Sequence, residues 1–168
     1  MKFAIAVSAA CLIAAALVST SSAFAANDEA KIKALEDRFT AAFNAKDVDS
    51  IMKVYAPDES LFVFDVIPPR QYVGATAYRK DWSDFLATFK GPAKMTLDDL
   101  AITSDGNLAF SHSVQHVTGT DTKGKAVDFT VRVTDGYKKI DGKWLIVQEH
   151  VSVPVNVETG VADMMSKP

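Results

Sequence analysis

The chain has 168 residues, enough for one domain with a substantial hydrophobic core. Its 18 basic and 21 acidic side chains give a net negative charge, which argues against nucleic acid or an anionic membrane as a main partner. The single cysteine, Cys11, lies in an apolar N-terminal stretch. A thiol nucleophile, a disulfide and a cysteine–zinc site are therefore not expected in the rest of the chain.

Residues 1–25 have the pattern of a secretory signal peptide. Lys2 gives a positive start, an apolar run follows, and Ala23-Phe24-Ala25 matches the A-x-A cleavage signal. A signal anchor is the alternative reading, but the run is short for a membrane span. The sequence therefore predicts cleavage between Ala25 and Ala26, a periplasmic or secreted protein, and no membrane segment after cleavage.

Cleavage leaves one predicted domain, residues 26–155, and a C-terminal tail, residues 156–168, that lacks periodicity. Helical spacing of apolar residues predicts three helices, over residues 28–45, 48–55 and about 75–90. Asn27 or Asp28 can cap the first of them. A short strand is expected between the second and third helices, over 61–65.

The apolar period changes to two in the second half of the chain. Four strands are predicted there, over residues 94–103, 108–118, 127–139 and 143–154. Asp105-Gly106 and Asp141-Gly142 separate neighbouring runs and are strong hairpin signals. Helices first and strands after predict an α+β fold, a cone-shaped curved antiparallel sheet closed on one side by three N-terminal helices.

Three ionisable side chains fall on predicted strand faces that are otherwise apolar: His112, Asp135 and Glu149. Because residues i and i+2 lie on one side of a strand, these groups point where the core should be. Burying a charge without a partner is costly, so the pattern predicts a lined cavity. The apolar residues expected to line it are Phe39, Tyr55, Tyr78, Trp82, Phe110, Val114, Tyr137, Val147 and Val151.

The two acids admit two interpretations. A carboxyl in an apolar pocket has a raised pKa and can act as acid or base near neutral pH, with His112 as a base oriented by Asp135 or Glu149. The alternative is that each group pairs with a neighbour and only ties the sheet together. His112 and His116 lie roughly 13 Å apart along a strand, too far to bind one metal ion. Neither a metal nor a cofactor is expected, since no phosphate or dinucleotide motif is present.

Several segments together resemble a known superfamily. Phe39-Thr-Ala-Ala-Phe-Asn-Ala-Lys-Asp47, Tyr55-Ala-Pro-Asp58 and Gly74 with Ala77-Tyr78-Arg79 resemble the first half of nuclear transport factor 2-like (cystatin-like) proteins. The segment from Asp141 to Ser152 resembles their last hairpin, also seen in the calcium/calmodulin-dependent kinase II association domain. The match is closest to SnoaL-like and ketosteroid-isomerase-like proteins. The resemblance covers roughly residues 30–154 and implies the fold described above.

The resemblance also implies roles for three positions. Asp65 falls where ketosteroid isomerases place their general-base aspartate, and Asp135 where they place the protonated acid of the oxyanion hole. Phe39 occupies the position of their oxyanion-hole tyrosine, and a phenyl ring cannot donate a hydrogen bond to a developing enolate. Loss of one such donor typically costs roughly 100- to 1000-fold in rate.

Two functions follow from the sequence. The first is an exported protein whose enclosed pocket binds a small hydrophobic ligand. The second is an acid/base enzyme, an isomerase, dehydratase or cyclase, using Asp65, His112, Asp135 and Glu149. A homodimer is also expected, through the sheet face that carries Trp144, Ile146, Gln148, His150 and Ser152, since that face mixes a large aromatic with polar groups.

Overall fold

The structure is a computed structural model that describes the backbone of residues 8–166 and the side chains of residues 26–166. Of the predicted signal peptide, the structure therefore describes only the backbone of residues 8–25. At the predicted cleavage site, the side chain of Ala26 is described and that of Ala25 lies outside the described residues. No helix in the described part of the chain is both long enough and apolar enough to cross a membrane.

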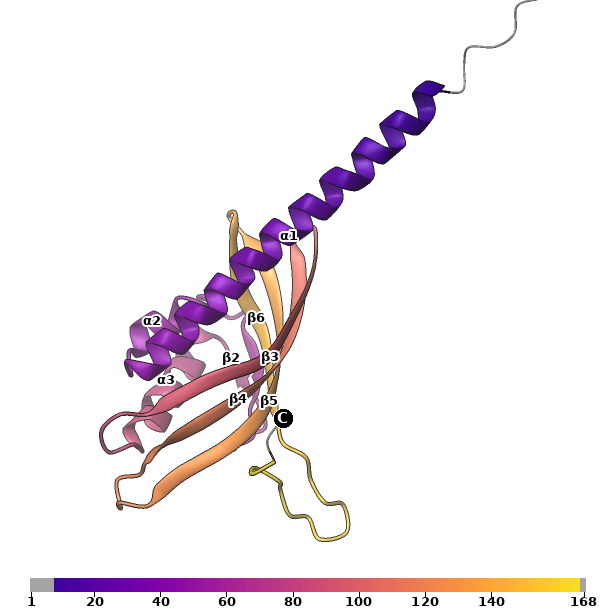
Figure 1. Cartoon of the computed structure of the whole chain (residues 1–168). Helices are drawn as coiled ribbons and strands as arrows, with labels where there is room; N and C mark the ends of the chain where they lie inside the picture. Colours follow the sequence, from indigo (N-terminus) through magenta and orange to yellow (C-terminus); the bar gives the residue numbers. More distant parts are fainter. Residues whose placement is uncertain (1–7, 167–168) are drawn as a thin grey trace, which may run out of the picture.

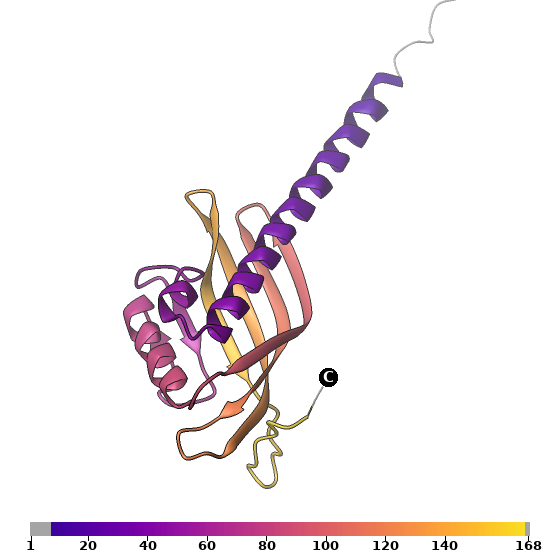
Figure 2. The same cartoon turned by 60° about the vertical axis from the view of Figure 1, so that its left-hand side comes forward.

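Three helices pack on one face of a curved six-stranded sheet (Figures 1 and 2). In chain order the elements are α1 (Ser8–Asn44), α2 (Val48–Met52), β1 (Phe62–Phe64), β2 (Tyr72–Val73), α3 (Ala75–Ala87), β3 (Lys94–Asp105), β4 (Leu108–Thr120), β5 (Ala126–Ile140) and β6 (Lys143–Ser152). The α+β class with three helices on one side of the sheet is confirmed.

The order of the strands across the sheet is β2-β1-β6-β5-β4-β3. The antiparallel meander of β3 to β6 is as predicted. The expectation of a wholly antiparallel sheet is wrong, because β1 pairs in parallel with β6. A parallel pair needs a long connection, and here α3 and the meander supply it. The sheet is mixed and does not close into a barrel.

Asp28 ties α1 to the sheet and does not cap a helix. The helix runs through this position, so the predicted N-terminal cap is wrong. The Asp28 carboxylate instead accepts hydrogen bonds from Lys139 Nζ at 2.6 Å and from Trp144 Nε1 at 3.2 Å. The bond from Lys139 is the main reason that the pKa of Asp28 is lowered to about 2. This contact ties α1 to the sheet three residues after the predicted cleavage site.

A β-bulge in β6 reverses the predicted orientation of that strand's first half. Ile146 pairs with Tyr137 and Gln148 with Gly136, which leaves Val147 as the extra residue. Trp144 and Ile146 consequently face the helices, with exposures of 5% and 1%. The prediction that these two side chains lie on the outer face is wrong, whereas Gln148 and His150 do lie there, exposed.

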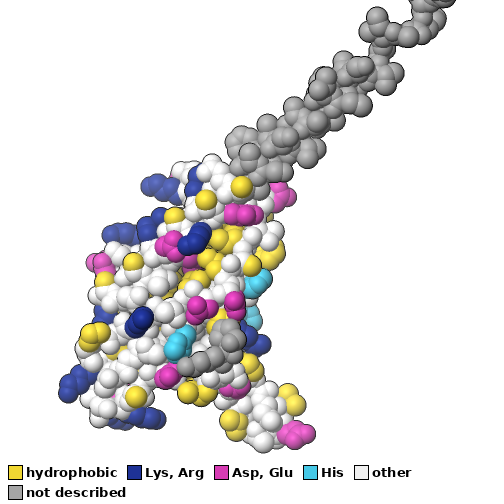
Figure 3. All heavy atoms as spheres, in the orientation of Figure 1, with side chains coloured by type: hydrophobic (Ala, Val, Ile, Leu, Met, Phe, Trp, Pro, Cys, Tyr) yellow, Lys and Arg dark blue, Asp and Glu magenta, His cyan; other side chains and the backbone are white. Residues whose placement is uncertain are grey.

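The tail folds back on itself beside the sheet. Val155 bridges to Ala162, and the amide of Asn156 donates to the carbonyl of Val161 at 2.9 Å. The chain then returns to the sheet, where the Thr130 amide donates to the Met164 carbonyl at 2.8 Å. Figure 1 shows this yellow segment next to the sheet, below the label of β5. On the face that Figure 3 shows, basic and acidic side chains are interspersed.

Candidate functional site

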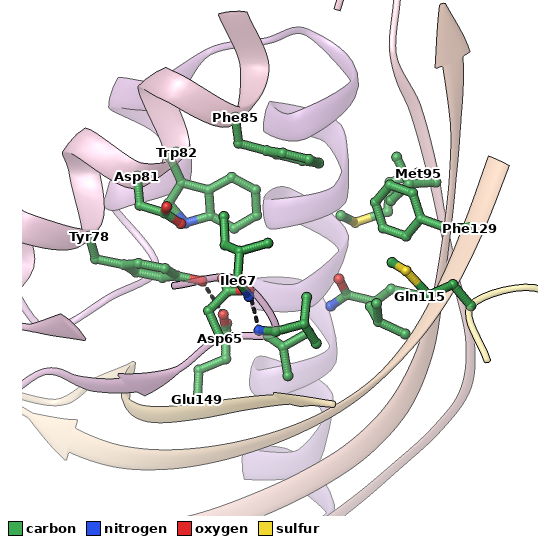
Figure 4. A pocket seen from close by; sticks show the side chains of 15 residues that line it. Asp65, Ile67, Tyr78, Asp81, Trp82, Phe85, Met95, Gln115, Phe129 and Glu149 are labelled. Carbon is green, nitrogen blue, oxygen red and sulfur yellow. Dashed lines mark hydrogen bonds between the residues drawn. The ribbon is translucent and has the colours of Figure 1, made fainter. Parts of the chain in front are cut away.

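A cavity of about 240 Å³ lies between α3 and the inner face of the sheet. Figure 4 shows it from close by, with α3 on one side and the strands on the other. Its walls are mostly apolar. The lining residues are Asp65, Val66, Ile67, Tyr78, Asp81, Trp82, Phe85, Met95, Gln115, Val117, Phe129, Val131, Glu149, Val151 and Met164.

Glu149 is the most buried carboxyl that reaches this cavity. The side chain is 3% exposed and meets Tyr78 from α3 (Figure 4). Tyr78 donates a hydrogen bond to Oε1, and the Tyr55 hydroxyl donates to Oε2 at 2.7 Å. Burial raises the pKa of Glu149 to about 7, and the two tyrosine bonds oppose the shift. Glu149 is thus a carboxyl that changes charge near neutral pH.

Asp135 lies behind Glu149 on the neighbouring strand. The register pairs the two residues directly, and their carboxyls share a side-chain hydrogen bond. Burial, and next the charge of Glu149, raise the pKa of Asp135 well above its usual range. Two adjacent buried carboxyls cannot both ionise easily, so Asp135 keeps its proton while Glu149 titrates. One oxygen of Asp135, Oδ1, has no hydrogen-bond partner among the described residues.

A third buried acid, Glu36, was not anticipated from the sequence. It is 2% exposed on α1 and accepts a hydrogen bond from the Tyr137 hydroxyl at 2.7 Å. Burial raises its pKa to about 7. A signal was available, because Glu36 follows Leu35 and lies one turn before the next apolar stripe position, Phe39. An acid on the apolar face of an amphipathic helix indicates a buried polar network.

Asp65 lies at the cavity wall just after β1, where the resemblance places a general base. Backbone amides of Val66 and Ile67 donate to its carboxylate. Burial, followed by the charge of Asp81, raises the pKa of Asp65. The charge of Asp65 in turn contributes to the raised pKa of Glu149. The two acids therefore act on one another across the cavity.

Seven of the nine predicted ligand-contact residues have inward side chains, and these form two groups. Tyr78, Trp82 and Val151 line the cavity. The others with inward side chains lie behind it: Phe39, Tyr55, Tyr137 and the half-buried Val147 of the bulge. Phe39 packs edge-on against Trp82, with ring centroids 5.5 Å apart. The Trp82 indole Nε1 is buried and has no hydrogen-bond partner among the described residues.

The predicted orientation of β4 is wrong. His112 is exposed and Phe110 is 54% exposed, while Val114 lies on the same outer side. Opposing residues of an antiparallel pair share a face, and Ser111 lies opposite the inward Asp135. The inner side of β4 carries polar residues, one of which, Ser111, hydrogen-bonds Tyr137 at 2.8 Å. Apolar alternation therefore marked the outer face of this strand, and His112 does not lie near Glu149.

The cavity-lining residues that the sequence did not single out have different origins. Phe85 continues the aromatic face of α3, so its helical spacing was a usable signal. Gln115 extends into the cavity (Figure 4) and was missed because of the reversed orientation of β4. Met164 comes from the tail, which has no periodic pattern. Among the described residues there is no group of three or more His, Cys, Asp or Glu side chains placed to hold a metal ion.

Comparisons with known proteins agree with this architecture. A model of the SnoaL-like domain matches residues 32–156. A solved NTF2-like protein of unknown function from Pseudomonas putida KT2440 is 29% identical, with a TM-score of 0.76 over 85% of this chain and 98% of that one. No curated protein matches the chain.

Two further solved structures are similar. A candidate calcium/calmodulin dependent protein kinase II association domain from Xanthomonas campestris is 27% identical, with a TM-score of 0.62 over 72% of this chain and 84% of that one. A candidate scytalone dehydratase from Novosphingobium aromaticivorans is 16% identical, with a TM-score of 0.68 over 84% of this chain and 95% of that one. At that identity the second similarity concerns the fold alone.

Proposed function

This chain belongs to the SnoaL-like domain family of the NTF2-like superfamily, and from that premise we propose that it binds a small, mostly apolar molecule in the cavity beside α3. The observation that carries the proposal is a carboxyl with a near-neutral pKa, Glu149, set into a mostly apolar wall. A concave apolar site with a few convergent polar groups is the usual form of a small-molecule site.

The size of the cavity limits the ligand. Its volume of about 240 Å³ is below the roughly 300–1,000 Å³ of sites for drug-sized molecules. A ligand with one ring and a short substituent is therefore expected. Its polar atom would meet Glu149 while its ring contacts Trp82 and Phe85.

Native mass spectrometry of the purified protein tests the binding proposal. We expect a retained small molecule, or uptake of single-ring probes, in the wild type. Val131→Phe, which fills the cavity wall, should abolish uptake, whereas Val157→Phe on the exposed tail is the matched control. Uptake that is unchanged in Val131→Phe would contradict binding at this site.

Acid/base catalysis is the second candidate function. The observation that favours it is the pair of acids with raised pKa values, Asp65 and Glu149, on one cavity. At neutral pH Glu149 can accept or donate a proton. Asp135 behind it stays protonated, so the two neighbouring carboxyls keep separate pKa values.

Glu149→Gln keeps the shape and both tyrosine contacts but cannot take up a proton. Turnover of a substrate should then fall at least 100-fold with little change in its binding. Equal loss of binding and turnover would point to a binding role alone.

Export is a further proposal, supported by the A-x-A motif before Ala26 and by Asp28, which lies shortly after the predicted cleavage site and is bonded to the sheet. The intact mass of the protein isolated from the producing cell tests it. We expect a chain that begins at Ala26. A mass that includes residues 1–25 would contradict the proposal.

A further inference from the structure

Three carboxyl groups line the cavity without any basic side chain. Asp65, Asp81 and Glu149 come from three different elements, and none of the described lining residues is Lys, Arg or His. Tyr72 donates a hydrogen bond to Asp81 at 2.6 Å, but a hydroxyl carries no balancing charge. No lining side chain therefore balances the negative charge of these acids, and Lys80, whose charge acts to lower the pKa of Asp81, lies outside the lining.

The aromatic walls suit an organic cation. Tyr78, Trp82, Phe85 and Phe129 all line the cavity, and Phe85 lies edge-on to Trp82 and to Phe129 at centroid distances of 6.1 and 6.3 Å. The faces of such rings attract an ammonium group, and the attraction grows when water is excluded. A bare metal ion would instead need several oxygen ligands converging on one point.

A polar side chain in the wall indicates a second feature of the occupant. The Trp82 Nε1 has no hydrogen-bond partner among the described residues, but protein atoms enclose it, so an occupant of the cavity does not reach it. Gln115 extends into the cavity, and its side-chain amide can donate a hydrogen bond to an acceptor atom of the occupant (Figure 4).

We propose that the cavity takes a small organic amine, protonated at neutral pH, with one ring-sized apolar part and a hydrogen-bond acceptor. The inference rests on the proposed binding function and narrows it to a charge class. A carboxylate or phosphate ligand would meet three acids and no counter-charge. A neutral ligand would leave those acids desolvated without a counter-charge.

Three probes with one skeleton test the charge class: 2-phenoxyethylamine, 2-phenoxyethanol and phenoxyacetate. Each has a single ring and an ether oxygen, and they differ in carrying a positive, zero or negative charge. In isothermal titration calorimetry at pH 7.5, the amine should bind at least tenfold more tightly than the alcohol. The acid should not bind. If the alcohol binds as tightly as the amine, the amine inference fails and the binding proposal stands. If none of the three binds, both fail.

The pH dependence provides an independent check. The groups that face the ammonium position are Asp65, Asp81 and Glu149, with Tyr55, Tyr78 and the protonated Asp135 next to Glu149. Burial raises the pKa of Glu149 to about 7, so this carboxyl is mostly protonated at pH 6 and mostly ionised at pH 8. Burial also raises the pKa values of Asp65 and Asp81. Affinity for the amine should therefore rise several-fold from pH 6 to pH 8, with protons released on binding. Constant affinity over this range would overturn the inference.

Matched variants locate the charge that matters. Asp81→Asn keeps an acceptor for Tyr72 and removes one cavity charge, so the preference for the amine over the alcohol should fall at least threefold. Asp84→Asn removes the same charge from the same helix at an exposed position and should leave the preference unchanged. Equal effects of the two changes would show only a long-range charge effect and would refute a site for the ammonium group.

Discussion

At the scale of single residues, the buried acids Glu36, Asp135 and Glu149 set the pH response of the protein. Each lies largely among apolar side chains, tyrosine hydroxyls and other acids, and burial is the first cause of its raised pKa. Tyrosine hydroxyls donate hydrogen bonds to Glu36 and Glu149. These bonds stabilise the ionised carboxylates but do not neutralise their charge. The folded protein therefore holds protons that its unfolded chain would release.

The stability of the fold should consequently fall as the pH rises from about 4.5 to about 7. In that window the folded state binds more protons than the unfolded state, so the free energy of unfolding decreases with pH. Glu36→Gln should remove on the order of 2 kcal/mol of this pH dependence. Urea unfolding at pH 5 and pH 8 measures it, with Glu158→Gln on the exposed tail as the control. A wild type that is more stable at pH 8 than at pH 5 would contradict the raised pKa values of these acids.

At the scale of elements, the bulge at Val147 decides which side chains of β6 enter the core. Trp144→Ala should destabilise the fold by about 3–5 kcal/mol, because the ring is buried and its Nε1 is bonded to Asp28. Leu145→Ala should cost less than half as much, since Leu145 is only half-buried. Denaturant unfolding of the two variants compares them. A larger loss of stability in Leu145→Ala than in Trp144→Ala would contradict the bulge and support the orientation that simple alternation predicts.

The two strands whose orientation was mispredicted show what the sequence contains and what it lacks. Helical stripes and Asp-Gly turns predicted the elements in chain order, because each depends on neighbouring residues. The inward positions of Asp135 and Glu149 also followed from alternation. The faces of β4 and of Trp144 could not be predicted, because they depend on a bulge and on pairing with distant residues. The cavity therefore contains Gln115 where the sequence suggested His112.

At the scale of the whole molecule, the outer face of the sheet supports the proposal of a homodimer. Phe64 and His150 lie edge-on to one another there with ring centroids 5.5 Å apart, and Phe110 is 54% exposed. An exposed aromatic on a polar sheet face is typical of an interface. With Trp144 and Ile146 in the core, the contact would involve Phe110, Gln148 and His150.

Light scattering after gel filtration tests this face. The wild type should have the mass of two chains at micromolar concentration, and Phe110→Lys should shift it to one chain by placing a charge in the contact. Val157→Lys adds the same charge at a side chain that is 95% exposed on the tail, and should leave the dimer intact. A wild type that runs as one chain would refute the proposal.

The return of the tail to β5 has a kinetic consequence. Among residues 156–166, Met164 lines the cavity. In the described part of the chain, the hydrogen bond from the Thr130 amide holds its backbone to the sheet. Breaking that bond leaves every strand pairing of the sheet intact. The residence time of an occupant can then be set by the rate at which the tail detaches, while its affinity is set by the walls. Two proteins with the same cavity could thus differ in exchange rate through the tail alone.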